Sequence, residues 1–479
     1  MKSIKGSRPA RRLAVESLES RQMLATASLS GGMLFINGAN GHVPENVTID
    51  QAPDGRLTVS GLGTNGWQSQ TLGPVLGIIA DLKGGNDTIS IGTPDLPIPL
   101  LTTLNLRLGD GSDTANISVN IPGTVIIDGG MQYGMPNGGG MQNGIALVNG
   151  NSQNDSINID RSLIATLMVN TWAGDDNLWV SRSGVFSMFA NLGVESLPNG
   201  QRDYDYVDIE SSGFGLATIS VGASGVAVDV GNEVEISSTL FGSLTVNGGR
   251  GIDRVFIDSD SDGFGGSGLG SWLPSHLVNT AESLEPILDG LIGRLPINVG
   301  SLLGNLDGLL GNLPQLGGIA LPGGLDLDLS DIIADLSQVN LADFDLSDAL
   351  EDLLRGVDLS FLGDYSVLGH LNVNTQGGND VVDVFQSGVA WWAMINTGAG
   401  DDEVYLTAFN AHTSLFVLLG ADDDTLELFG ASAGSAFLDG GPGYDGLLDE
   451  SSPQLGRRSR TIINFEFDIL IPEFPNFPT

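Results

Sequence analysis

An aspartate recurs in this chain at a nearly constant spacing and with constant neighbours. Asp380, Asp402, Asp424 and Asp445 are separated by 22, 22 and 21 residues. An apolar residue stands two positions after each of them, and another stands seven positions before. A fixed period of this length is typical of a stacked solenoid, in which each repeat forms one coil. The period therefore constrains the fold more than any other feature of the sequence.

The same pattern extends into the first half of the chain. Apolar residues follow, at plus two and plus four, the residues Asp87, Asp155, Asp176, Asp205, Asn232 and Asp253. Alternation of this kind predicts strands with one buried face. Asp113 and Asp155 are 42 residues apart, which is twice 21, so we predict a further coil between them that includes residues 125–127. A glycine- and methionine-rich surface loop is expected at 129–144.

Asparagine recurs six positions before the aspartate. It does so at Asn149, Asn170, Asn247, Asn374 and Asn396. One residue type at one position of successive coils predicts an asparagine ladder, in which side-chain amides bond from coil to coil. The alternative is that asparagine tolerates a left-handed turn backbone.

The predicted fold is all-β: a right-handed parallel β-helix with about 21–22 residues per coil. Each coil has two clear strands and enough further residues for a short third side. A two-sided roll needs only about nine residues per half-turn, so the longer coil favours a parallel β-helix. Roughly a dozen coils at about 4.8 Å each would give a rod about 50–60 Å long. The predicted segments are an export segment (1–25), a first solenoid part (26–258), an insertion rich in Leu, Gly and Asp (259–370), a second solenoid part (371–450), and a closing strand with a tail (451–479).

Composition excludes several classes of protein. The formal net charge of -39 and the pI near 4.1 argue against a nucleic-acid binder and suit work among divalent cations. Without cysteine, neither disulfides nor thiolate metal sites can form. Prolines and glycines in the uncharged stretch 308–325 argue against a membrane span. The insertion is expected to form short amphipathic helices, and residues 461–469 a closing strand.

Residues 1–25 are basic but lack the apolar run of an ordinary signal peptide. Arg-Arg-Leu at 11–13, followed by Leu-Glu-Ser-Arg-Gln-Met-Leu-Ala at 18–25, resembles the Leu-Glu-Pro-Arg-x-Leu-Leu signature at the N-termini of many planctomycete proteins. Ser20 and Met23 depart from that signature. The resemblance implies export of a repeat-bearing protein and names no activity. The alternative is an ordinary basic amphipathic helix.

Gly-Gly-x-Gly-x-Asp occurs in full at 248–253 and 440–445, and close variants occur at 109–113, 378–380 and 398–402. These motifs resemble the calcium-binding nonapeptide of repeats-in-toxin (hemolysin-type) proteins. The resemblance implies Ca²⁺ held by backbone carbonyls and the Asp carboxylate. In that family the motif recurs about every nine residues, whereas here it recurs about every 21, so the half-sites need not pair in the same way.

Electrostatics independently suggests a cation. Carboxylates of adjacent coils about 4.8 Å apart repel each other by roughly 3.5 kcal/mol at an effective dielectric constant of about 20. They either hold Ca²⁺ or remain solvated while each caps its own turn. The candidate metal ligands are Asp113, Asp253, Asp380, Asp401, Asp402, Asp423, Asp424 and Asp445.

A second acidic motif, with Asp258, Asp260 and Asp262, begins the insertion and adds three candidate ligands. It has the spacing of the first six positions of a calcium loop, but Leu269 at position twelve excludes a full EF-hand. An acidic solvated loop is the alternative.

Evidence for an enzyme is weak. Gly-Asp-Asp at 174–176 and 400–402 matches a motif of polygalacturonases, which share the β-helix, but it is already part of the repeat, and their partner motifs are absent. The four histidines form no spaced cluster. Of Trp391 and Trp392, one must face outward, where it packs beneath the insertion or stacks on a sugar ring; packing is preferred.

The sequence thus predicts an exported, calcium-stabilised structural or adhesive solenoid of the cell surface or extracellular matrix. Its expected partners are an extracellular polysaccharide or a surface protein. The alternatives are a polysaccharide-active β-helix enzyme (lyase or glycoside hydrolase) and a purely structural rod without an ion. No oligomeric state is predicted.

Overall fold

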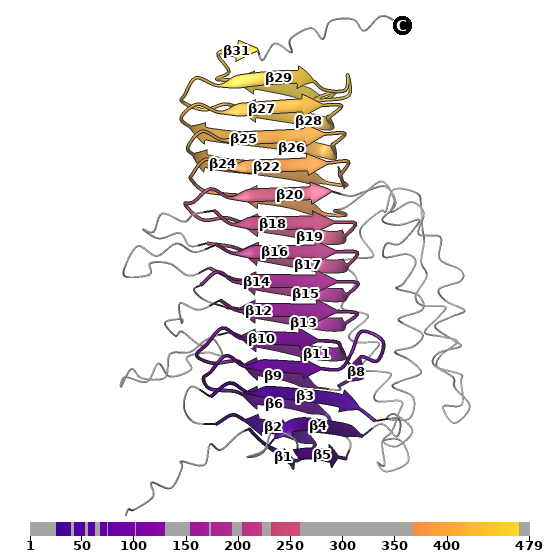
Figure 1. The fold of residues 1–479 in the computed structure, drawn as a ribbon. Coiled ribbons are helices and arrows are strands. Elements are labelled where there is room, and N and C mark those ends of the chain that lie inside the picture. The colour runs from indigo at the N-terminus through magenta and orange to yellow at the C-terminus, as the bar shows by residue number, and fades with distance from the viewer. Residues whose placement is uncertain are drawn as a thin grey trace, which may run out of the picture.

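The computed structural model describes residues 25–39, 43–52, 56–62, 68–73, 75–100, 102–129, 154–171, 174–193, 204–222, 231–258 and 367–468. Within these ranges every helix or strand element is a β-strand. The strands form two sheets that are stacked rung upon rung along one axis (Figure 1). The prediction of an all-β parallel solenoid is confirmed.

The two sheets are called sheet A and sheet B. In the described part of the chain, sheet A consists of β1 (Thr26–Ser30), β2 (Met33–Asn37), β6 (Gly77–Asp81), β8 (Ile98–Pro99), β9 (Thr103–Arg107), β11 (Val119–Asp128), β13 (Leu163–Asn170), β15 (Gly184–Asn191), β17 (Gly213–Ser220), β19 (Leu240–Asn247), β21 (His370–Asn374), β23 (Gly388–Val389), β24 (Trp392–Ala399), β26 (Asn410–Ala421), β28 (Ser432–Asp439) and β30 (Ser459–Ile463). Sheet B consists of β3 (Asn46–Gln51), β4 (Leu57–Leu62), β5 (Gln68–Leu72), β7 (Thr88–Ile91), β10 (Thr114–Ile117), β12 (Ser156–Asp160), β14 (Asn177–Ser181), β16 (Tyr206–Glu210), β18 (Glu233–Ser237), β20 (Arg254–Asp258), β22 (Val381–Phe385), β25 (Glu403–Thr407), β27 (Thr425–Phe429), β29 (Gly446–Glu450) and β31 (Phe467–Asp468).

The core lies between the sheets and is built from the predicted apolar columns. In β25, Val404 and Leu406 stand at plus two and plus four from Asp402 and are fully buried. Ile395, seven positions before Asp402, is buried on the facing strand β24. Each such side chain contributes about 1.5–3 kcal/mol when it is removed from water. Because neighbouring strands pair in register, the same positions stack from coil to coil.

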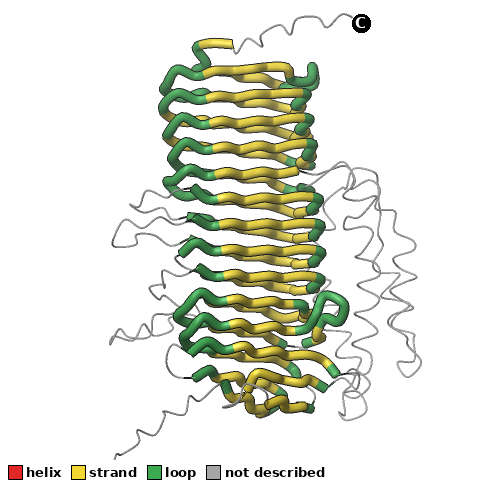
Figure 2. The backbone as a smooth tube through the Cα atoms, in the orientation of Figure 1, coloured by secondary structure: helices red, strands yellow, loops and turns green. Residues whose placement is uncertain are grey.

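The short third side expected in each coil corresponds to the segment just before the main sheet A strand, and this segment pairs with its equivalents as part of sheet A. The two-residue strands β8 and β23 pair with the first residues of β11 and β26. The pairing register then shifts, between Ile121 and Thr124 in β11 and between Ala411 and Ser414 in β26. Loops and turns lie at the two edges of the stack, where the chain passes from one sheet to the other (Figure 2).

The predicted extra coil between Asp113 and Asp155 is wrong. Strand β10 pairs directly with β12, with Ala115 opposite Ile157, and β11 pairs directly with β13. One coil therefore separates the two aspartates. The interval between them is about one repeat longer than a single coil, and the additional residues, 130–153, lie outside the described part of the chain. The loop predicted at 129–144 also lies there, except for Gly129.

The insertion leaves the register of the solenoid unchanged. Val246 in β19 stands opposite Val373 in β21, and β20 pairs with β22 on the other sheet. Bridges from Val367 to Phe241 and Val389 show that coil pairing resumes at Val367, four residues before the predicted boundary. The helices predicted in the insertion lie outside the described residues.

The two ends of the rod differ from its middle. At the N-terminal end, β1 and β2 pair antiparallel, as do β3 and β4 and also β4 and β5. At the C-terminal end, the single predicted closing strand is instead two strands, because Asn464 adopts a left-handed backbone (φ 57°) between them. Strand β30 extends sheet A and β31 extends sheet B.

Two links of the predicted asparagine ladder are present at the end of the sheet A strands. The Nδ2 group of Asn191 donates to Oδ1 of Asn170 at 2.9 Å, and Asn396 donates to Asn374 at 2.8 Å. These residues lie in strands without a left-handed backbone, so amide bonding between coils explains these two links. Asn247, another predicted member, instead donates to Oγ of Ser220 at 3.3 Å. Asn149 lies outside the described residues.

Candidate functional site

The recurring aspartate lies at the corner where the chain enters sheet B. It directly precedes a strand, as Asp402 precedes β25, and its side chain is on the same inner face as the core residues at plus two and plus four. Asp380, Asp402, Asp424 and Asp445 are at most 1% exposed. The predicted ligands Asp113 and Asp253 are equally buried. These carboxylates are therefore inside the rod, away from solvent.

Each buried carboxylate accepts a hydrogen bond from the backbone of the preceding coil. The N–H of Asp380 donates to Oδ1 of Asp402 at 2.8 Å, and the N–H of Asp402 donates to Oδ1 of Asp424 at 2.9 Å. The same bond joins Asp424 to Asp445 at 2.9 Å. The corner N–H groups have no strand partner of their own, so the side chains satisfy donors that would otherwise be buried and unpaired.

This arrangement, here called the carboxylate ladder, continues from one end of the described rod to the other. In chain order it consists of Glu45, Asp87, Asp113, Asp155, Asp176, Asp205, Asn232, Asp253, Asp380, Asp402, Asp424, Asp445 and Glu466. Asn232 accepts the N–H of Asp205 through Oδ1 at 3.0 Å, so an amide can serve in the column as well as a carboxyl group.

Burial makes the ladder carboxyl groups weak acids. Loss of solvent, only partly offset by the bond from the preceding backbone N–H, raises the pKa of Asp402 and of Asp424 to about 7. Burial raises the pKa of Asp113 to about 8 and, with repulsion from Asp176 added, that of Asp155 to about 10. The Oδ2 atoms of Asp402 and Asp424 are also buried and make no hydrogen bond, which adds to the cost of carrying charge.

A second, exposed row lies one residue earlier at the same corner. The N–H of Asp401 donates to Oδ1 of Asn379 at 3.2 Å, and the N–H of Asp423 donates to Oδ1 of Asp401 at 3.1 Å. Tyr444 then donates its N–H to Oδ1 of Asp423 at 2.9 Å. The outer side chains thus cap the following coil, whereas the inner ones cap the preceding coil. Adjacent corner residues therefore bind coils on opposite sides.

The glycine motif has a structural explanation at this corner. Gly400 has a φ of +128°, and a Cβ atom there would lie 2.0 Å from the carbonyl oxygen of Gly378 on the neighbouring coil. In the full motif at 248–253, Oδ2 of Asp253 accepts the N–H of Gly249 at 2.6 Å, and Oδ1 accepts Nδ2 of Asn232 at 2.9 Å. The motif thus permits close backbone approach and also binds the Asp carboxylate.

The donor set at the inner corner fits Ca²⁺ poorly. Calcium takes six to eight oxygen ligands, whereas at Asp402 and Asp424 the Oδ1 atom already accepts an N–H group and only the buried Oδ2 atom is left. Within the described ranges, no group of three or more His, Asp or Glu side chains could hold a metal ion. The structure leaves Asp401 and Asp423 on the surface, and it places Asp258 at the end of β20. Asp260 and Asp262 lie outside the described residues, so calcium binding stays a prediction.

A third column was missed by the sequence reasoning. At the opposite corner, buried hydroxyl groups follow the ladder position by seven residues: Ser162, Ser183, Ser212, Thr239 and Ser387. The N–H of Ser162 donates to Oγ of Ser183 at 3.1 Å, and the N–H of Ser183 donates to Oγ of Ser212 at 3.1 Å. The recurrence of Ser or Thr at plus seven was the available signal.

Comparison of the chain with protein family models, with curated proteins and with solved structures found no match. In the part of the chain that the structure describes, there is no helix long and apolar enough to cross a membrane.

Proposed function

We propose that this chain is an exported structural or adhesive β-solenoid of the cell surface or extracellular matrix, without enzymatic activity. The observation that carries the proposal is the continuous carboxylate ladder. Its recurring side chains join the backbones of successive coils from Glu45 to Glu466. A repeated residue whose bonds link coil to coil suits a rod, whereas a catalytic centre needs a single local constellation.

The outer face of sheet B supports the adhesive part of the proposal. Trp179 and Tyr206 pack edge to face with their ring centroids 6.2 Å apart, and the Tyr206 hydroxyl donates to Glu235 at 2.5 Å. Asp208 and Glu235 lie side by side on paired strands, and the pKa of Asp208 is raised by burial and by Glu235. A flat parallel sheet that presents aromatic and acidic side chains suits contact with an extended partner.

The enzymatic alternative has less support from the geometry. In Gly400-Asp401-Asp402, the carboxylate of Asp401 accepts the N–H of Asp423, and that of Asp402 accepts the N–H of Asp380. The Asp402 carboxyl group faces the core, where a polysaccharide cannot reach it. Turnover of an acidic polysaccharide that is abolished by Asp401→Ala would contradict the proposal.

Export is testable by fractionation. We expect the tagged full-length chain in the cell envelope or the medium, and deletion of residues 1–24 should retain it in the cytoplasm. Arg21→Gln, which changes the N-terminal signature, should reduce export, whereas Lys2→Gln, outside the signature, should not. Cytoplasmic retention of the unmodified chain would overturn the localisation.

Calcium stabilisation is a separate prediction. An ion that binds only the folded rod stabilises it, by about 2.7 kcal/mol when its concentration is one hundred times its Kd. We therefore expect a melting temperature several degrees higher in millimolar CaCl2 than in EDTA, with MgCl2 as the control for ionic effects. The double variant Asp401→Asn/Asp423→Asn keeps the Oδ1 acceptors of the outer row but removes its charge, so it should lose the calcium effect. Equal melting in EDTA and calcium would reject bound calcium and leave the structural proposal intact.

A further inference from the structure

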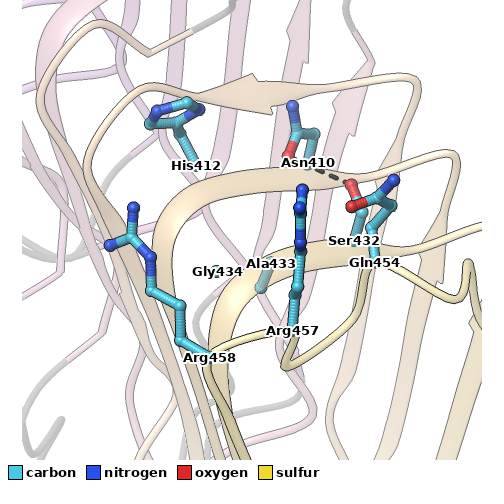
Figure 3. Close-up of a pocket in the computed structure, with 8 residues that line it drawn as sticks. All are labelled: Asn410, His412, Ser432, Ala433, Gly434, Gln454, Arg457 and Arg458. Atoms are coloured by element: carbon cyan, nitrogen blue, oxygen red, sulfur yellow. Dashed lines mark hydrogen bonds between the residues drawn. The ribbon is translucent and has the colours of Figure 1, made fainter.

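A polar pocket of about 580 Å³ lies on the last coils of the rod. Its walls include Asn410 and His412 from β26, Ser432 from β28, and Arg457 and Arg458 from the turn before β30. Figure 3 shows the two arginines extending from that turn toward His412 and Asn410. A hollow of this volume accommodates one or two sugar rings.

The pocket lies at a one-residue difference between neighbouring coils. Ala411 pairs with Ala433, and Ser414 pairs with Ser435, so two residues on β26 face a single residue, Gly434, on β28. A Cβ atom at Gly434 would lie 2.7 Å from the carbonyl oxygen of Thr413. A side chain at this position would therefore collide with the neighbouring backbone. Gly434 lines the pocket between the coil of His412 and the turn of the arginines, where the N–H of Arg458 donates to its carbonyl oxygen at 2.7 Å.

The charge of the pocket is opposite to that of the chain. The protein has 58 acidic and 19 basic residues, yet among the residues that the structure describes no Asp or Glu lines the pocket. Arg161, Arg182 and Arg460 form ion pairs with Asp95, Asp160 and Asp449. Among the described residues no ion pair holds Arg457 or Arg458, and both are exposed. Two unpaired guanidinium groups beside an imidazole offer several N–H donors to an oxyanion.

An exposed aromatic ring lies one coil away on the same edge of sheet A. The N–H of Thr413, next to His412, donates to the carbonyl oxygen of Trp391 at 2.8 Å. Trp391 is 47% exposed, and its ring is held by an edge contact with His370 at 5.2 Å. His370 also stacks on Trp392 at 4.7 Å. A fixed and open indole face can stack on the apolar face of a sugar ring.

We propose that this pocket, with Trp391, binds a negatively charged sugar unit of an extracellular polysaccharide. The arginines and His412 would hold the carboxylate or sulfate group, Asn410 and Ser432 would contact hydroxyl groups, and Trp391 would stack on the next ring. The inference rests on the proposed adhesive function and names its ligand class. The proposal is one of binding and not of catalysis, since the described lining residues include no carboxylate to act as acid or base.

The test is calorimetric titration of the full chain with oligogalacturonate, with a sulfated dextran oligosaccharide and with neutral dextran. We expect binding of one or both anionic probes and none of the neutral one; the anionic probe bound more tightly identifies the oxyanion. Arg457→Gln/Arg458→Gln should weaken binding at least tenfold, since hydrogen bonds to charged groups are strong. Trp391→Ala should weaken it severalfold.

The matched control is Arg250→Gln/Arg254→Gln, which removes the same charge from two exposed arginines elsewhere on the rod. It should leave the affinity unchanged. Equal loss in both double variants would mean non-specific attraction and would overturn the pocket, as would unchanged binding in Arg457→Gln/Arg458→Gln. Absence of binding to both anionic probes would also overturn the proposed sugar-binding pocket. The proposed function would still be supported in that case if the chain fractionates with the cell surface. Circular dichroism of each variant separates lost binding from lost folding.

Discussion

Replacing Asp402 by alanine is expected to lower the free energy of unfolding by about 2–4 kcal/mol. The substitution leaves the buried N–H of Asp380 without an acceptor, which costs about 1–3 kcal/mol, and it leaves a cavity beneath the corner. Asparagine should be tolerated to within about 1 kcal/mol, because it retains the acceptor. Urea denaturation at pH 6, followed by circular dichroism, measures both variants.

The carboxylate ladder already contains an asparagine, Asn232. Asn232 accepts the preceding N–H through Oδ1, and its Nδ2 group donates to the carbonyl oxygen of Val221 at 3.1 Å. Thr397 occupies the register position of Val221 in the coil of Asp402, so its carbonyl group can receive the new amide.

The matched control for Asp402 is its neighbour. Asp401 also accepts a backbone N–H, from Asp423 at 3.1 Å, but it is exposed, so water can replace its carboxylate. Asp401→Ala should therefore cost less than about 1 kcal/mol. If Asp401→Ala and Asp402→Ala are equally destabilising, burial is not what makes the ladder important. If Asp402→Asn is as harmful as Asp402→Ala, the acceptor role is wrong.

The fold could be predicted because a solenoid repeats its core. Alternate apolar residues after each aspartate define a half-buried strand, and a constant period allows only in-register stacking. The count of coils was less secure, because an interval of 42 residues fits two coils or one coil with a long loop. The direct pairing of β10 with β12 shows a single coil between Asp113 and Asp155, and the remaining residues of the interval, 130–153, lie outside the described part of the chain.

The burial of the aspartate could also have been inferred. A residue that precedes buried neighbours by two and four positions has the same parity as they do, and in a strand it faces the same side. A carboxylate is rarely buried without a partner, so the sequence analysis allowed it only a bound Ca²⁺ ion or a solvated position capping its own turn. Its partner is a backbone N–H from another coil, which no side-chain pattern reveals. The pocket at Gly434 escaped notice because it lies at a one-residue difference between coils that are otherwise alike.

Stability is expected to fall as the pH rises from 5 to 9. Burial raises the pKa of Asp380, Asp402 and Asp424 to about 7 in the folded rod, from the ordinary value of 3.8. Between these values the folded state binds more protons than the unfolded state, so the ladder stabilises the rod fully at about pH 4 and loses that contribution as the pH rises through 7. The difference between these two pKa values corresponds to on the order of 4 kcal/mol for each such aspartate. Urea midpoints measured at intervals of one pH unit give the slope.

General repulsion among the 58 acidic residues also lowers stability as the pH rises. Variants are therefore needed to separate the contribution of the ladder from that of the other carboxylates. Asp402→Asn cannot ionise and should flatten the slope around pH 7, becoming more stable than the unmodified chain at pH 9. Asp401→Asn removes one exposed charge from the same corner and should shift the whole curve slightly without changing its slope near pH 7. A stability that is level or rises between pH 5 and 9 would contradict protonated ladder carboxyl groups. So would equal slopes in the two variants, because only the buried carboxyl group has a proton to lose in that range.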